Sequence, residues 1–133
     1  MNTNRNVRTV AVLQLVTAAG LALFWIGFFT VGLAPENAPA CYMAYERAFP
    51  LPDGILACAM AWAGVSLLRE RGPGRLLTHA SAGALIFLGI LDFSFNIQNG
   101  IYALSALDLA LNGFINAWCV GFGMASIAVT REG

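Results

Sequence analysis

Four long apolar stretches, separated by short polar segments, dominate the order of residues along this chain of 133 amino acids. They cover residues 9–33, 51–68, 76–95 and about 101–129. A helix needs about 20 predominantly apolar residues to cross about 30 Å of hydrocarbon, and the four stretches are close to or above that length. The pattern therefore predicts an all-α membrane protein, with four transmembrane helices in an antiparallel bundle that forms a single domain over residues 1–133.

The composition agrees with this class of protein. Hydrophobic residues make up 59% of the sequence and charged residues 11%, whereas about 25% of the residues in a soluble domain are charged. The sequence has no basic patch suited to nucleic acid. We therefore expect the lipid bilayer as a partner, and no nucleic acid.

The arginines predict the orientation in the membrane. Lysine is absent, so the seven basic residues are all arginine. Six of them flank the same ends of the apolar stretches: Arg5, Arg8, Arg69, Arg71, Arg75 and Arg131. Because basic residues gather in cytoplasmic loops, we expect both termini to be cytoplasmic (N-in and C-in), in a bacterial plasma (inner) membrane.

The acidic residues lie mostly toward the other, outer side. Five of the seven are found there: Glu36, Glu46, Asp53, Asp92 and Asp108. Asp53 follows Pro52 at the start of the second stretch, a position that favours a helix cap. We therefore expect Asp53 to cap the second helix, and we look to the other acids for a binding site.

Two of these acids are predicted to lie at the same depth. Gln98, Asn99 and Gly100 favour a tight turn between the third and fourth stretches. At a rise of about 1.5 Å per residue, Asp92 and Asp108 each lie about 10–12 Å from this turn. We therefore expect them on neighbouring helices, near the outer edge of the hydrocarbon.

Amide side chains extend these two positions along the same helix faces. Asp92 and Asn96 are one turn apart on the third helix, and Asp108, Asn112 and Asn116 share one face of the fourth. Polar groups in hydrocarbon cost several kcal/mol unless they are paired. The two polar faces should therefore meet each other or line a wet cavity that opens to the outside.

The outer loop, residues 34–50, is predicted to contain a short interfacial helix. Asn37 followed by alanine and proline resembles a helix start. Tyr42 and Tyr45 recur on one face, and tyrosine favours the membrane interface. This helix either anchors the loop in the interface or acts as a lid that carries Glu46, and the arginine after it, over the carboxylates.

Other reactive residues give no pattern. Cys41, Cys58 and Cys119 stand singly, which supports neither a thiol-oxidoreductase motif nor a zinc site. His79 lies near the cytoplasmic end of the third stretch, where an interfacial position explains it better than metal or haem ligation. We therefore expect no metal and no cofactor.

The hypothesis that follows is an outward-facing site that binds or conducts a cation or a small polar ligand. Oxygen ligands suit hard cations, and the outer acids would attract them. The residues predicted to form or gate this site are Asp92, Asp108, Asn96, Asn112, Asn116, Glu46, Tyr42 and Tyr45.

Two alternatives stay open from the sequence. A membrane enzyme could use Asp92 and Asp108 as acid and base on a lipid or sterol-like substrate, and would need an apolar cavity that opens sideways to lipid. An accessory subunit would instead bury its polar faces against a larger membrane complex or a second copy of the chain.

Overall fold

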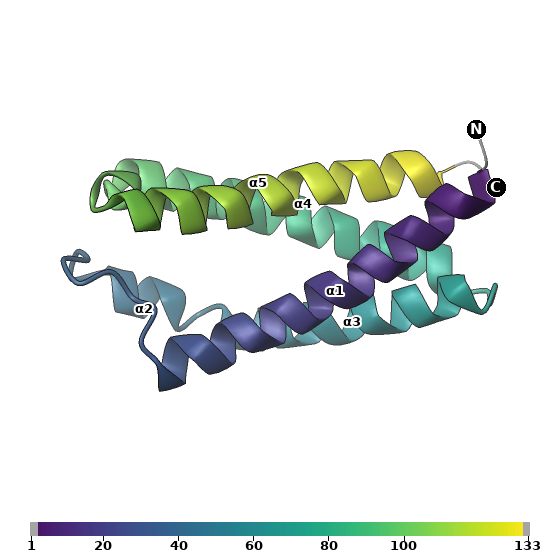
Figure 1. The fold of residues 1–133 in the computed structure, drawn as a ribbon, viewed down its shortest axis with the longest axis horizontal. Coiled ribbons are helices and arrows are strands. Elements are labelled where there is room, and N and C mark those ends of the chain that lie inside the picture. The colour runs from purple at the N-terminus through teal and green to yellow at the C-terminus, as the bar shows by residue number, and fades with distance from the viewer. Residues whose placement is uncertain (1–2, 132–133) are drawn as a thin grey trace.

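The computed structural model describes residues 3–131, and its long elements are all helices (Figure 1). They are α1 (Thr3–Thr30), α2 (Tyr42–Glu46), α3 (Pro50–Leu68), α4 (Gly74–Gln98), the 3₁₀ helix η1 (Ile101–Ala103) and α5 (Ala106–Thr130). Within the described residues, four helical segments are long and apolar enough to cross a membrane: Asn4–Thr30, Tyr42–Leu68, Gly74–Gln98 and Ala106–Thr130. The prediction of an all-α chain with four helices able to cross a membrane is confirmed.

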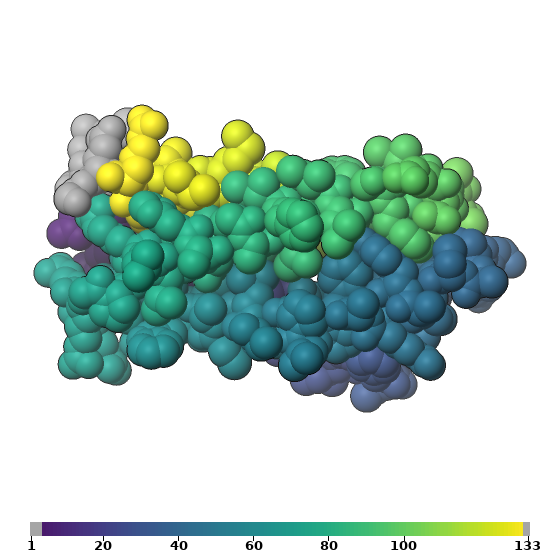
Figure 2. Space-filling view, turned by 180° about the vertical axis from the view of Figure 1, so that it is seen from behind, coloured from purple at the N-terminus to yellow at the C-terminus, as the bar shows by residue number. Residues whose placement is uncertain are grey.

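The helices pack as two pairs. α1 lies against α3, and α4 lies against α5, while α3 and α4 join the pairs. α1 and α5 contact each other only over a short length. In Figure 1 the two pairs are close at the end that holds both termini and diverge toward the end that holds α2. On the opposite face, shown in Figure 2, the side chains of α3 and α4 meet.

Small residues explain why the two helices of each pair pack closely against each other. A Cβ atom added to Gly64 of α3 would lie 2.7 Å from the carbonyl oxygen of Ala11 in α1. Likewise, a Cβ atom on Gly123 of α5 would lie 2.8 Å from the carbonyl oxygen of Ala82 in α4. Glycine thus lets these backbones approach, as is common between membrane helices. Both contacts lie toward the termini, whereas the pairs separate at the other end.

A mixed apolar core joins all four long helices. Its buried side chains are Ala18, Leu56, Met60, Leu85 and Phe122. A second apolar cluster lies nearer to α2, where Phe28, Tyr42 and Ile101 are buried together. The region between these two clusters contains the cavity described below.

The ends of two long helices differ from the sequence prediction. α1 ends at Thr30 rather than at residue 33, because Gly32 adopts a left-handed backbone (φ 82°) that terminates the helix. α5 begins at Ala106 rather than near residue 101, because Ser105 is extended and its hydroxyl accepts a hydrogen bond from the backbone amide of Asp108. The turn at Gly100 is left-handed, as its sequence favours, but η1 lengthens the connection.

The short helix of the first loop also begins later than predicted. Asn37 lies before it and does not cap it, since α2 starts at Tyr42 after Cys41. The helix has only five residues. The amide of Phe49 then bonds the carbonyl of Glu46, and α3 starts at the next residue, Pro50. α2 is therefore nearly continuous with α3, which determines where its side chains lie.

Candidate functional site

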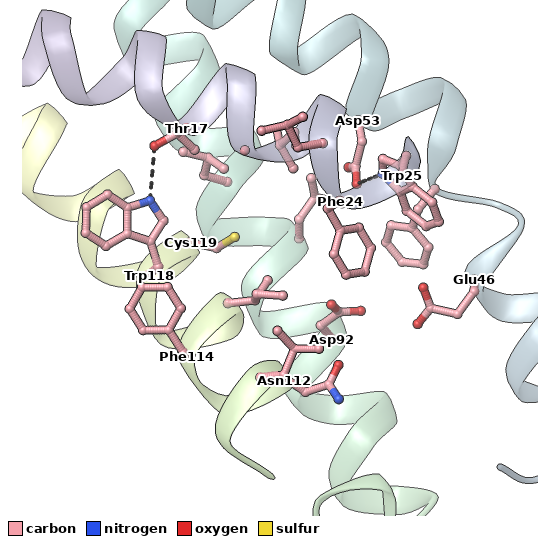
Figure 3. Close-up of a pocket in the computed structure, with 18 of the residues that line it drawn as sticks. Thr17, Phe24, Trp25, Glu46, Asp53, Asp92, Asn112, Phe114, Trp118 and Cys119 are labelled. Atoms are coloured by element: carbon pink, nitrogen blue, oxygen red, sulfur yellow. Dashed lines mark hydrogen bonds between the residues drawn. The ribbon is translucent and has the colours of Figure 1, made fainter. Parts of the chain in front are cut away.

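A cavity of about 590 Å³ lies between α1 and α5, with α4 and the start of α3 behind it. Most of its wall is apolar, and its polar groups gather at the end nearer to α2 (Figure 3). The residues that line it are Val16, Thr17, Gly20, Leu21, Leu23, Phe24, Trp25, Glu46, Phe49, Asp53, Leu85, Leu88, Asp92, Leu111, Asn112, Phe114, Ile115, Trp118 and Cys119.

The open side of the cavity is rimmed by apolar residues. Val16 and Leu23 of α1 are 58% and 68% exposed, and Phe114 of α5 is 67% exposed. Gly20, between the two α1 residues, is also exposed. Because α1 and α5 contact each other only over a short length, the cavity opens sideways between them. Apolar side chains of these two helices surround the opening.

The end of the cavity nearer the termini is closed by a link between these two helices. The indole nitrogen of Trp118 in α5 donates a hydrogen bond to the hydroxyl of Thr17 in α1 (3.1 Å; Figure 3). The Trp118 ring also stacks on Phe122 and Phe114. This link defines one end of the cavity, and Cys119 lies beside it.

Three carboxylates occupy the other end. Glu46 of α2, Asp53 of α3 and Asp92 of α4 point toward a shared space in Figure 3. They are close enough for each to interact electrostatically with the other two. No basic side chain is among the described residues that line the cavity, so this end carries an uncompensated acidic cluster.

Asp92 is held by a tyrosine of α2. The hydroxyl of Tyr45 donates a hydrogen bond to Oδ1 of Asp92 (2.7 Å). The Tyr45 ring stacks in parallel on Phe95, with 3.7 Å between centroids, and meets Phe49 edge-on. The stacking on Phe95 and the hydrogen bond to Asp92 thus hold α2 against α4, and Glu46 follows Tyr45 directly.

Asp53 does not cap α3, contrary to the expectation from sequence. The helix begins earlier, with Phe49 as N-cap and without a side-chain capping bond. Instead, Oδ2 of Asp53 accepts a hydrogen bond from the indole nitrogen of Trp25 in α1 (2.9 Å). Its other oxygen, Oδ1, is buried and has no hydrogen-bond partner among the described residues. Asp53 is therefore part of the cavity wall.

α2 covers the polar end of the cavity. Its side chains Tyr42 and Glu46 are buried, with 3% and 9% exposed. The Tyr42 hydroxyl interacts with the carboxylate of Glu46 one turn later. Arg47 is exposed and does not line the cavity. If this helix is a lid, it carries Glu46 over the carboxylates, as one of the two alternatives expected, but it does not carry Arg47 there.

Asp108 lies outside the cavity. Its backbone amide donates to the hydroxyl of Ser105, which in turn donates to the Asp108 carboxylate (3.0 and 2.6 Å). This reciprocal bonding caps the start of α5 and is typical of an N-terminal helix cap. Asp92 therefore meets Tyr45 and the acids Glu46 and Asp53, rather than the Asp108 partner that depth counting predicted.

The three asparagines are placed differently from one another. Asn112 lines the cavity, and its amide nitrogen donates to the carbonyl oxygen of Asp108 (3.0 Å). Asn116 is 1% exposed and donates to the hydroxyl of Tyr102 (2.7 Å), which joins α5 to η1. Asn96 is 2% exposed and also lies outside the cavity wall. Only Asn112 of the predicted amides reaches the site.

Sequence reasoning missed the aromatic part of the site. Trp25 and Phe24 line its polar end in Figure 3, and Phe49 is also part of the wall, yet in the sequence they are ordinary apolar residues. A buried indole N–H requires an acceptor, so Trp25 within an apolar stretch was the available sign that a polar group lies opposite. Nothing in the sequence indicated that this acceptor would be Asp53.

Among residues 3–131, no group of three or more histidine, cysteine, aspartate or glutamate side chains is arranged to hold a metal ion.

Comparison of the chain with protein families, with curated proteins and with solved structures found no match.

Proposed function

We propose that this protein spans a bacterial plasma membrane and binds a lipid-like amphiphile, which enters the cavity sideways from the bilayer. Both termini lie in the cytoplasm, and the four spans form an antiparallel bundle. The carboxylate end of the cavity then lies near the outer edge of the hydrocarbon, with α2 at the interface. The apolar part lies at the level of the acyl chains.

The observation that carries this proposal is the combination of an apolar rim and a polar end. Val16 to Trp25 cover about 13 Å of rise along α1, so the cavity is elongated along the helices. Its volume of about 590 Å³ is within the usual range of about 300–1,000 Å³ for ligand sites. An amphiphile would place its tail against leucine and phenylalanine and its head near Asp53 and Asp92.

This proposal differs from the leading hypothesis drawn from sequence. An outward-facing cation site needs a wet vestibule, but the outer end of this cavity is covered by the buried side chains Tyr42 and Glu46. The wall is mainly apolar, which suits a tail better than a hydrated ion. The lateral opening is the feature expected for a lipid-like ligand, whether the protein carries that ligand or acts on it.

The test is photolabelling in phosphatidylcholine vesicles with a long-chain alcohol that carries a diazirine in its tail. We expect saturable labelling, competed by the unlabelled alcohol and mapped to cavity residues such as Leu21, Leu88 and Ile115. Labelling without saturation, spread over lipid-facing residues such as Leu109, would refute the proposal.

Two glycines provide a matched pair of variants. A Cβ added to Gly20 or to Gly83 meets no atom within 4 Å, and both residues are exposed on their helices. Only Gly20 lines the cavity. Gly20→Leu should place its side chain at the opening and reduce saturable labelling severalfold, whereas Gly83→Leu should leave it unchanged. Equal labelling of the two variants would contradict entry between α1 and α5.

A further inference from the structure

The polar end of the cavity is rich in hydrogen-bond acceptors, and its aromatic donors are already engaged. The indole N–H of Trp25 donates to Asp53, and the hydroxyl of Tyr45 donates to Asp92. The amide nitrogen of Asn112 donates one of its two hydrogens to the backbone carbonyl of Asp108. A ligand head group that supplies donors would therefore match the carboxylate oxygens of this end.

One of these acceptors is buried and unsatisfied. Asp53 is 8% exposed, and its Oδ1 atom has no partner among the described residues. An unpaired buried polar atom costs about 1–3 kcal/mol, and more when it is charged. Because Asp53 lies in the cavity wall, a donor on the ligand would remove this cost.

The charge at this end points to a cationic donor. Glu46, Asp53 and Asp92 interact with one another electrostatically, and no described basic residue lines the cavity to compensate them. A buried charge needs a partner of opposite sign. A positively charged head would pair with these carboxylates, whereas a carboxylate or phosphate head would be repelled by them.

The aromatic residues beside the acids suit the same chemistry. Trp25 and Phe24 line the cavity next to Asp53 (Figure 3). Phe49, whose backbone carbonyl accepts from the amide of Asp53, also lines it. Aromatic faces attract ammonium groups, including methylated ones, within about 6 Å of the ring centre. Carboxylates together with tryptophan and phenylalanine therefore form a chemically consistent environment for an alkylammonium head.

We propose that the ligand of this cavity is a long-chain amine, a tail that ends in a primary or methylated ammonium group bound between Asp53, Glu46 and Asp92. This inference rests on the proposed function, since it specifies the head group of the same amphiphile. It excludes anionic amphiphiles such as fatty acids as preferred ligands.

The test uses the photolabelling assay in phosphatidylcholine vesicles, with three competitors of equal chain length: dodecylamine, dodecanol and dodecanoate. We expect dodecylamine to compete about tenfold to a hundredfold more strongly than dodecanol, which is the range for a hydrogen bond between charged groups. Dodecanoate should be the weakest. If dodecanol matches dodecylamine, or dodecanoate is the strongest, the amine proposal is overturned while the lipid-binding proposal stands.

Variants then assign the selectivity to this protein rather than to the vesicles. Asp53→Asn removes the charge and keeps an oxygen for Trp25, so it should reduce the advantage of dodecylamine about tenfold or more. Glu36→Gln is the matched control, because Glu36 is an exposed acid in the loop between α1 and α2, outside the cavity. If Asp53→Asn does not fold, Glu46→Gln provides the same test. An unchanged advantage in the folded variants would refute the assignment.

If no saturable labelling is found with any competitor, the proposed function itself fails. Saturable labelling without amine preference refutes only the head-group assignment. The two failures are therefore distinguishable within one experiment.

Discussion

The contact between Tyr45 and Asp92 should determine how firmly α2 covers the cavity, and Tyr45→Phe tests this with the removal of one oxygen. The variant loses the 2.7 Å hydrogen bond to Asp92. It keeps the aromatic ring, which stacks on Phe95 at 3.7 Å and contacts Phe49 at 4.8 Å between centroids. The change therefore isolates the hydrogen bond from the packing.

The expected magnitude follows from the type of bond. A hydrogen bond to a charged group contributes about 1.5–3 kcal/mol, while each retained aromatic pair contributes about 0.5–1.5 kcal/mol. Loss of the bond alone should raise the population of a detached α2 by a factor of about 10–100. The long helices should be unaffected, since the contact with Asp92 lies between α2 and α4.

Hydrogen exchange measures this local opening. The reporter amides are those of Tyr45 and Arg47, which bond the carbonyls of Cys41 and Met43 within α2. They should exchange about 10–100 times faster in Tyr45→Phe, while amides in the middle of α4 stay as slow as before. A double-mutant cycle with Asp92→Asn should give a coupling energy of about 1 kcal/mol or more. Unchanged amide exchange rates in α2, together with a coupling energy near zero, would show that the hydrogen bond between Tyr45 and Asp92 does not hold α2 in place.

Two further predictions concern stability. Gly64→Ala places a Cβ atom 2.7 Å from the Ala11 carbonyl oxygen, whereas the Cβ atom of Gly83→Ala meets no atom within 4 Å. Overpacking should make Gly64→Ala about 1–3 kcal/mol less stable than Gly83→Ala, as measured by unfolding in mixed micelles. Equal stabilities would contradict the close approach of α1 and α3. Ser105→Ala removes the cap of α5 and should lower the stability by about 0.5–2 kcal/mol without changing saturable photolabelling. A loss of labelling in the folded variant would show that this cap also supports the cavity.

Part of the site could be predicted from the sequence. An ionisable side chain within an apolar stretch is expensive, and this identified Asp92 as a residue that needs a partner. A short helix before the second apolar stretch could also be expected, although its start at Tyr42 rather than near Asn37 could not. A lid that carries Glu46 is one of the two alternatives that the sequence leaves open for it. These arguments depend on local order and on depth along a helix, which the sequence contains.

The partners of these residues could not be predicted. The rise per residue places Asp92 and Asp108 at the same depth on neighbouring helices. Two side chains at the same depth can still point in different directions. Asp108 is directed to Ser105 in its own first turn, and Asp92 is directed to Tyr45. The proline before Asp53 favours a helix cap, yet the rotation of α3 against α1 places the Asp53 carboxylate next to the indole nitrogen of Trp25.

The four apolar helices could be predicted because hydrophobic length is a property of each segment alone. The packing of the helices shows that α1 and α5 separate while α3 and α4 stay in contact, which creates a cavity with a lateral opening. Close approach depends on which small residues meet across two helices, as Gly64 meets Ala11 and Gly123 meets Ala82. These meetings depend on how the helices are rotated and displaced against one another, and the same packing brings Glu46, Asp53 and Asp92 to one end of one cavity.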